Sequence, residues 1–222
     1  MRRQGAIIAA VPLLIAVGMA IVSRHFELFR WISEENHLLE WLQFLLLVAA
    51  SVLLARSARN HVRAGFWVIG GLFLLAAVGV FFVAGEEIAW GQQVFGWGTP
   101  EPLAEVNVQG ETTLHNIGAA HNLFINLVMI GSGYAMIAPL MFSPFLGVHR
   151  RDIWYLLVPP LCLVPAFAMP FGYRFTRLLL TPEEHFPHAA YIITKYSETT
   201  ELCLYVGVFV FAVLLARRRG RA

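Results

Sequence analysis

Two adjacent carboxylates, Glu86 and Glu87, stand at the end of a long apolar run, in the segment GEEIAWGQQVFGW. Ionised carboxylates at a membrane boundary are costly unless they are hydrated, paired or bound to a metal ion. One interpretation is a catalytic pair, in which a carboxylate acts as a general base. The other is an interfacial or re-entrant turn with two solvated glutamates, because Trp90 and Trp97 suit the depth of lipid head groups.

A glutamate and a histidine with metal-ligand spacing follow in VQGETTLHNIGAAHN. Glu111 and His115 are four residues apart, so on a helix they share one face, which Asn122 and Asn126 continue into the next apolar run. His121 lies within reach of the same place. This spacing is one way to hold a single cation, although it also occurs in ion pairs on helix surfaces.

Further acidic side chains enter two other apolar runs. Glu40 and Gln43 share a face in one of them, and Glu198, Glu201 and Tyr205 share a face in another. Polar stripes on membrane helices face the interior of the bundle or a water-filled cavity, and rarely face lipid. The sequence therefore predicts that several carboxylates converge near the outer end of a helical bundle.

These carboxylates cannot all be ionised near one another in a medium of low dielectric without compensation. Arg174 and Arg177, the histidines, shared protons or a bound cation could supply it. Three interpretations stay open: a metal site, a network of shared protons and salt bridges, and unrelated surface acids. Histidine together with carboxylate favours zinc, iron or manganese over calcium, which prefers oxygen ligands alone.

The candidate site residues divide by expected role. Glu86 and Glu87 are the catalytic candidates. The metal ligands are predicted to be Glu111, His115, His121 and Glu198, and the residues that bind substrate are Arg174, Arg177 and Asn122. Glu40, Glu201 and His188 are additional polar groups of the same region.

The elements that must position these residues are membrane helices. Hydrophobic residues make up 58% of the 222-residue chain, charged residues 14%, and the mean hydropathy is +0.66, values that exclude a large water-soluble domain. A span needs about 20 apolar residues, so the chain is predicted to be one all-α transmembrane domain, residues 1–222, with six helices. The apolar runs cover 5–22, 38–55, 65–84, 121–146, 153–172 and 198–216, and the two long connections are 85–120 and 173–197.

Charge predicts the orientation of these spans. Eleven Lys and Arg residues fall on the side of the two termini and five on the other side, so both termini are expected in the cytoplasm. Thirteen of the fourteen acidic residues lie at the outer ends of the helices, where the candidate site is. We read the basic inner face as attracted to anionic lipid, so membrane lipids rather than nucleic acid are the expected partner.

The segments GEEIAWGQQVFGW and NVQGETTLHN together resemble a signature of uncharacterised bacterial polytopic membrane proteins. The resemblance covers about 30 residues and implies a bacterial inner-membrane protein, without implying an activity. Ala89 stands where many relatives have Ser. Glu34, Glu35, Asn36 and Glu40 also resemble the acidic segment of the alkaline ceramidase superfamily, but the chain departs from that family in its six spans and in lacking an HxxxH motif in the last helix.

Three functions are consistent with the sequence. The first is a metal-dependent membrane hydrolase that acts on a lipid or a lipid-linked substrate at the outer, periplasmic or extracellular, leaflet. The second is a non-catalytic subunit or assembly factor, which would bind a partner protein or a second copy of the chain. The third is a cation or proton transporter that uses Glu40, Glu201 and Asn126, although the sequence has no inverted repeat. The two cysteines, Cys162 and Cys203, lie in apolar runs and support neither a disulfide framework nor a cysteine zinc site.

Overall fold

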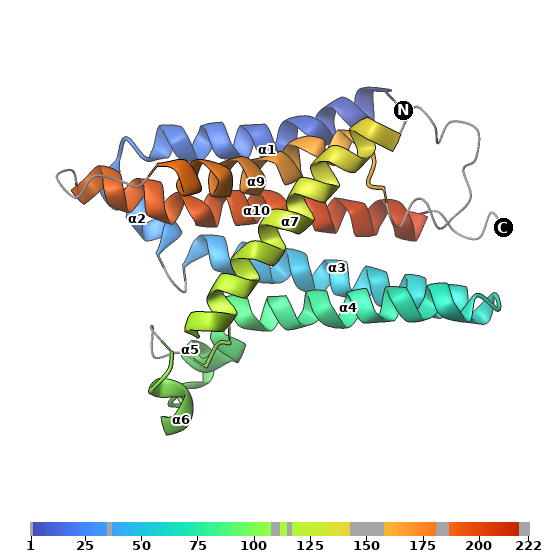
Figure 1. Cartoon of the computed structure of the whole chain (residues 1–222), viewed down its shortest axis with the longest axis horizontal. Helices are drawn as coiled ribbons and strands as arrows, with labels where there is room; N and C mark the ends of the chain where they lie inside the picture. The colour runs from blue at the N-terminus through green and yellow to red at the C-terminus, as the bar shows by residue number, and fades with distance from the viewer. Residues whose placement is uncertain are drawn as a thin grey trace.

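The structure is a computed structural model, and it describes residues 2–34, 37–107, 112–114, 117–142, 158–180 and 187–217. In these ranges the protein is a bundle of helices, which confirms the all-α prediction (Figure 1). Five segments are long and apolar enough to cross a membrane, and they contain α1, α3, α4, α7 and α10. Apolar helices suit a membrane because every interior backbone group is hydrogen-bonded within its own segment.

The first half of the chain contributes three of these long helices and one short one. Their bounds are α1 Arg2–Val22, α2 Phe26–Ser33, α3 Leu38–Arg63 and α4 Trp67–Glu87. With 21 residues, α4 is about 31 Å long, close to the roughly 30 Å hydrocarbon thickness of a bilayer. Glu86 and Glu87, its last two residues, are therefore expected at the membrane boundary.

The second half adds two long helices and one of intermediate length, with bounds α7 Gly118–Phe142, α9 Val164–Leu179 and α10 Pro187–Arg217. Helix α10 lies at the centre and contacts α1, α3 and α9. It runs antiparallel to α1, since the Tyr196 hydroxyl donates to the carbonyl of Ala16 and the Cys203 thiol to that of Pro12. The start of α1 and the end of α10 lie at the same end of the bundle (Figure 1).

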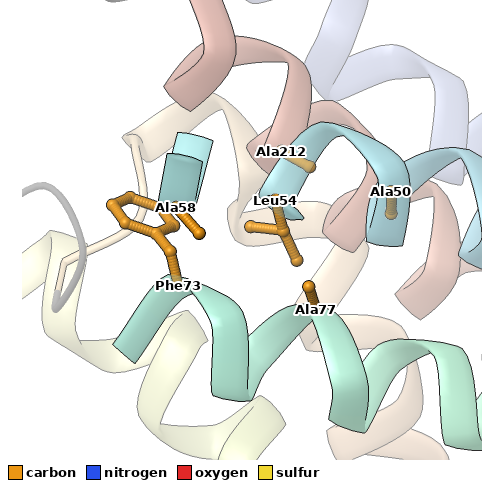
Figure 2. Close-up of a cluster of buried hydrophobic side chains, with 6 residues drawn as sticks. All are labelled: Ala50, Leu54, Ala58, Phe73, Ala77 and Ala212. Atoms are coloured by element: carbon orange, nitrogen blue, oxygen red, sulfur yellow. The ribbon is translucent and has the colours of Figure 1, made fainter. Parts of the chain in front are cut away.

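The core at this end of the bundle consists mostly of small side chains. Figure 2 shows Leu54 of α3 directed at Ala77 of α4, with Ala212 of α10 close behind. The Ser51 hydroxyl donates to the Ala77 carbonyl at 2.8 Å, which links α3 to α4. Small residues let membrane helices approach closely, and polar residues such as Ser51 then bond across the interface.

Helix α9 differs from the fifth predicted span, 153–172. Within the described residues the helix begins at Val164, after the short 3₁₀ helix η2 (Leu161–Leu163), and it ends at Leu179. Proline disfavours a helical conformation in the residue before it, and Pro159 and Pro160 precede this start. The 16 residues of α9 span about 24 Å, which is short of a full crossing.

Helix α7 crosses the bundle obliquely. In Figure 1 its start is drawn toward the end of α4, and along its course it packs against α9. A close contact holds the second half, because a Cβ atom on Gly133 would lie 3.0 Å from the ring of Phe171. Within the described residues α7 has no comparably extensive contact with α4.

The connection between α4 and α7 contains three short helical pieces in its described part. These are the 3₁₀ helix η1 (Ala89–Gly91), α5 (Gln92–Phe95) and α6 (Glu101–Ala104). Asn107 and Ile117 form an isolated antiparallel bridge that closes the connection. The interfacial or re-entrant segment was predicted for this part of the chain, and its position relative to a membrane stays a prediction.

Candidate functional site: an acidic cluster and an apolar groove

Glu86 is buried, with 5% of its surface exposed, and both of its carboxylate oxygens accept a hydrogen bond. Oε1 accepts from the indole nitrogen of Trp90, and Oε2 accepts from the backbone nitrogen of Leu114, each at 2.7 Å. Hydrogen bonds to an ionised acceptor are among the strong ones. Glu86 thus ties the end of α4 to the residues that lead into α7.

The turn after α4 is held in an unusual backbone conformation. Ala89, Trp90 and Gly91 have φ values of 45°, 55° and 82°, and non-glycine residues occupy this left-handed region at a cost of about 1–2 kcal/mol each. Trp90 is fixed there by its bond to Glu86 and by packing, because a Cβ atom on Gly85 would lie 2.8 Å from its ring. Backbone strain of this kind tends to occur at functional sites.

The amide of Gln92 links three parts of the connection. Its nitrogen donates to the hydroxyl of Thr99 at 2.9 Å, and its oxygen accepts from the backbone nitrogen of Thr112 at 2.7 Å. The Asn107 side chain donates in turn to the Thr113 carbonyl at 2.8 Å. These amides hold the chain beside Glu86 in place.

Glu87 points to a different part of the molecule. Its Oε1 accepts a hydrogen bond of 2.8 Å from the hydroxyl of Tyr205, a buried residue of α10. Consecutive helical residues are rotated by about 100°, which explains why the two neighbouring carboxylates diverge. Glu86 faces the connection to α7, and Glu87 faces the bundle.

Glu87 belongs to a group of four carboxylates, which we call the acidic cluster: Glu40, Glu87, Glu198 and Glu201. Glu87 lies in the electrostatic field of Glu201, Glu198 and Glu40. Arg174 of α9 pairs with Glu201, with 2.9 Å between Nη2 and Oε1, and the two side chains are 20% and 15% exposed. The fully buried Gln43 donates to the backbone carbonyl of Glu198 at 2.9 Å.

On the other side of α4 lies an apolar groove with a volume of about 620 Å³. Helix α4 contributes Gly79, Phe82, Val83 and Glu86 to its wall, and α7 contributes Leu123, Phe124, Leu127, Val128, Gly131 and Ser132. The described lining is completed by Ala120, also of α7, by Leu204 and Val208 of α10, by Phe167 of α9 and by Leu114. Among these residues Glu86 alone is ionisable, so the groove is apolar along its length and has one carboxylate in its wall.

Two of the four predicted metal ligands, Glu111 and His115, lie outside the described residues. His121 is exposed at the first turn of α7, whereas Glu198 belongs to the acidic cluster on α10. Within the described ranges, no group of three or more His, Cys, Asp or Glu residues is placed to hold a metal ion.

The predicted substrate-binding residues are separated in the structure. Arg174 is paired with Glu201, and Arg177 lies one turn further along α9. Asn122 is exposed on α7, as is Asn126. His188 stacks on Phe26 of α2, with 4.2 Å between ring centroids, and it precedes Glu198 by about 15 Å along α10.

Sequence reasoning did not identify the partners of Glu86. Trp90 was interpreted as an interfacial aromatic residue, and Gln92 had no predicted role. The four-residue spacing of Glu86 and Trp90 would have been the available signal, but it applies only if the helix continues, and here the chain leaves the helix between them. The groove has no signal in the sequence, because it arises from the oblique path of α7.

Comparison with known proteins adds no family assignment, since the chain matches no protein-family model, no curated protein and no solved structure.

Proposed function

We propose that this protein takes a membrane lipid or a lipid-linked molecule into the apolar groove and hydrolyses it near Glu86 with the help of a divalent metal ion. The observation that carries the proposal is the apolar groove itself, with the buried carboxylate of Glu86 in its wall. Ligand sites generally combine an apolar lining with a few fixed polar groups, and this groove has that composition.

The proposed roles follow from the position of each carboxylate. Glu86 lines the groove, so we assign to it the role of general base toward a molecule bound there. Glu87 bonds to Tyr205 on the other side of α4, and we assign it to the stability of the bundle.

The ligands of the metal ion would come mainly from the connection between α4 and α7, which Glu86 holds through its hydrogen bonds. We propose Glu111, His115 and His121 as its ligands, because three protein ligands leave a fourth position open for water. A bound divalent metal lowers the pKa of such a water to about 7, which makes it a nucleophile at neutral pH. Glu198, the fourth predicted ligand, lies in the acidic cluster, and Gln43 donates a hydrogen bond to its backbone carbonyl.

The excess of Lys and Arg at the end that holds the two termini supports a cytoplasmic location for that end. We therefore propose that Glu86 and the mouth of the groove face the periplasm or the exterior of a bacterial inner membrane.

Elemental analysis of the purified protein tests the metal part of this proposal. We expect zinc, iron or manganese at one ion per chain in the wild type, and its loss in Glu111→Ala and His115→Ala. His25→Ala is the matched control, since His25 lies on the same predicted side but before α2, and it should retain the metal. A wild-type protein without metal would remove metal-dependent hydrolysis from the proposal.

A second candidate function, a subunit of a membrane complex, is favoured by the exposure of Asn122 and Asn126 on α7. Amide side chains on a membrane helix rarely face lipid, and a neighbouring helix could supply their hydrogen bonds. Cross-linking from the neighbouring position Ile130→Cys, which is also exposed, would detect a partner helix. Cross-linking that Asn126→Leu abolishes would support this function, and an uncross-linked monomer in membranes would contradict it.

A further inference from the structure

We infer that the ligand of the groove is a lipid with an ammonium head group, one of whose acyl chains lies between α4 and α7. This inference rests on the proposed function, and it names the class of substrate for the same site.

The depth of the groove fits one leaflet of a bilayer. Its lining on α7 extends from Ala120 to Ser132, about 18 Å along this oblique helix, and its lining on α4 extends from Glu86 back to Gly79, about 10 Å. Half of the roughly 30 Å hydrocarbon core is about 15 Å. Because Glu86 lies at the end of α4, where that helix is expected to leave the membrane, the groove reaches from the boundary toward the midplane.

The groove is open along its side to the surrounding lipid. Leu123 and Leu127 line it and are still 60% and 58% exposed, and Phe82 on the opposite wall is 41% exposed. Such exposed apolar walls favour an acyl chain that enters sideways from the membrane, because the chain would cover apolar surface on both helices.

Two glycines leave space for the chain. Gly79 lies on the α4 wall and Gly131 on the α7 wall, and a Cβ atom added to either would meet nothing within 4 Å. The Cβ atom of a leucine at either position would therefore meet no neighbour, and we expect the rest of the side chain to extend into the groove. Leucine is also a better helix former than glycine, so these variants are expected to fold.

Charge selects the head group. No cationic side chain is among the described lining residues, and the carboxylate of Glu86 marks the end where the head group would lie. Of the outer arginines, Arg174 is paired with Glu201 and Arg30 with Glu34, and neither Arg24 nor Arg177 is among the described lining residues. The Glu86 carboxylate attracts an ammonium group, and the proposed divalent metal would attract the phosphate of the same head group, so the site is complementary to a zwitterionic lipid such as phosphatidylethanolamine.

Native mass spectrometry of the full chain with defined lipids tests the inference. The probes are phosphatidylethanolamine, its N-acetylated derivative, which lacks the ammonium charge, and phosphatidylglycerol, all with the same acyl chains. We expect bound phosphatidylethanolamine to exceed each of the other two about tenfold at equal concentration. Using altered lipids avoids replacing Glu86, which also holds Trp90 and Leu114 in place.

Gly79→Leu and Gly131→Leu should each reduce bound lipid at least about tenfold, because the side chain fills the groove. Gly71→Leu is the control, since Gly71 lies on α4 outside the groove and also has open space at its Cβ position. It should bind as the wild type does.

The outcomes separate the two proposals. Equal binding of the three lipids, with loss in the two leucine variants, would overturn the ammonium inference and leave lipid binding in the groove intact. Unchanged binding in both leucine variants would overturn the groove as the lipid site and the proposed function with it. The metal content of the wild type is measured independently of both.

Discussion

Glu86 and Glu87 show how far a single residue step changes the role of a carboxylate. Glu86 accepts hydrogen bonds from Trp90 and Leu114 and lines the groove, whereas Glu87 accepts one from Tyr205 inside the bundle. The sequence predicts that this pair is important but not which way each side chain points. That direction depends on where α4 ends and on what packs against its last turn.

At Tyr205, the change to Phe should lower the free energy of unfolding by about 1–3 kcal/mol, because Glu87 then lacks a buried donor. Glu87→Gln should cost less, since the amide oxygen can still accept from the Tyr205 hydroxyl. Thermal unfolding in detergent measures both. If Glu87→Gln were the more damaging change, the hydrogen bond would not be the stabilising contact.

The Arg174–Glu201 pair should be energetically coupled. Each side chain is mostly buried, so removing one partner deprives the other of a short ion-pair contact. Arg174→Met and Glu201→Gln should each lower the melting temperature, and the double variant should lose less than the two single losses added together. Strict additivity would mean that the two groups do not stabilise each other.

For the helices, the sequence predicted which segments are helical better than it predicted where each helix begins and ends. The apolar run at 38–55 became α3, which continues to Arg63, and the run at 198–216 became α10, which begins at Pro187. Hydropathy marks the part of a helix that meets lipid, whereas a helix continues into water as long as its residues favour it. The run at 153–172 could not be placed well because its prolines decide where α9 starts.

A substitution in the last turn of α4 tests how the end of this helix is held. Gly85→Ala would place a Cβ atom 2.8 Å from the Trp90 ring, so the ring must move and its bond to Glu86 weakens. We expect a lower melting temperature and reduced lipid binding. Gly18→Ala in α1 is the control, because nothing lies within 4 Å of its Cβ position, and it should be neutral or slightly stabilising. Equal effects of the two changes would show that the turn is not held by this contact.

For the whole molecule, the distribution of charge predicts a topology that labelling can test. In a background with Cys162→Ala and Cys203→Ala, Glu105→Cys should react with a membrane-impermeant maleimide from outside the cell. Arg59→Cys should react only after the membrane is opened. Both positions are exposed, so access is limited by the membrane and not by the fold. The reverse pattern would invert the proposed orientation.

Because α7 packs against the bundle mainly through its second half, the groove faces the hydrocarbon phase along its side. If the protein hydrolyses lipid as proposed, the substrate concentration that governs turnover would be the mole fraction of lipid in the bilayer and not its amount per volume of buffer. In mixed micelles, adding inert detergent at constant total substrate should slow the reaction in proportion to the dilution. An assay of the proposed hydrolysis should therefore express the substrate as its surface concentration in the micelle or bilayer.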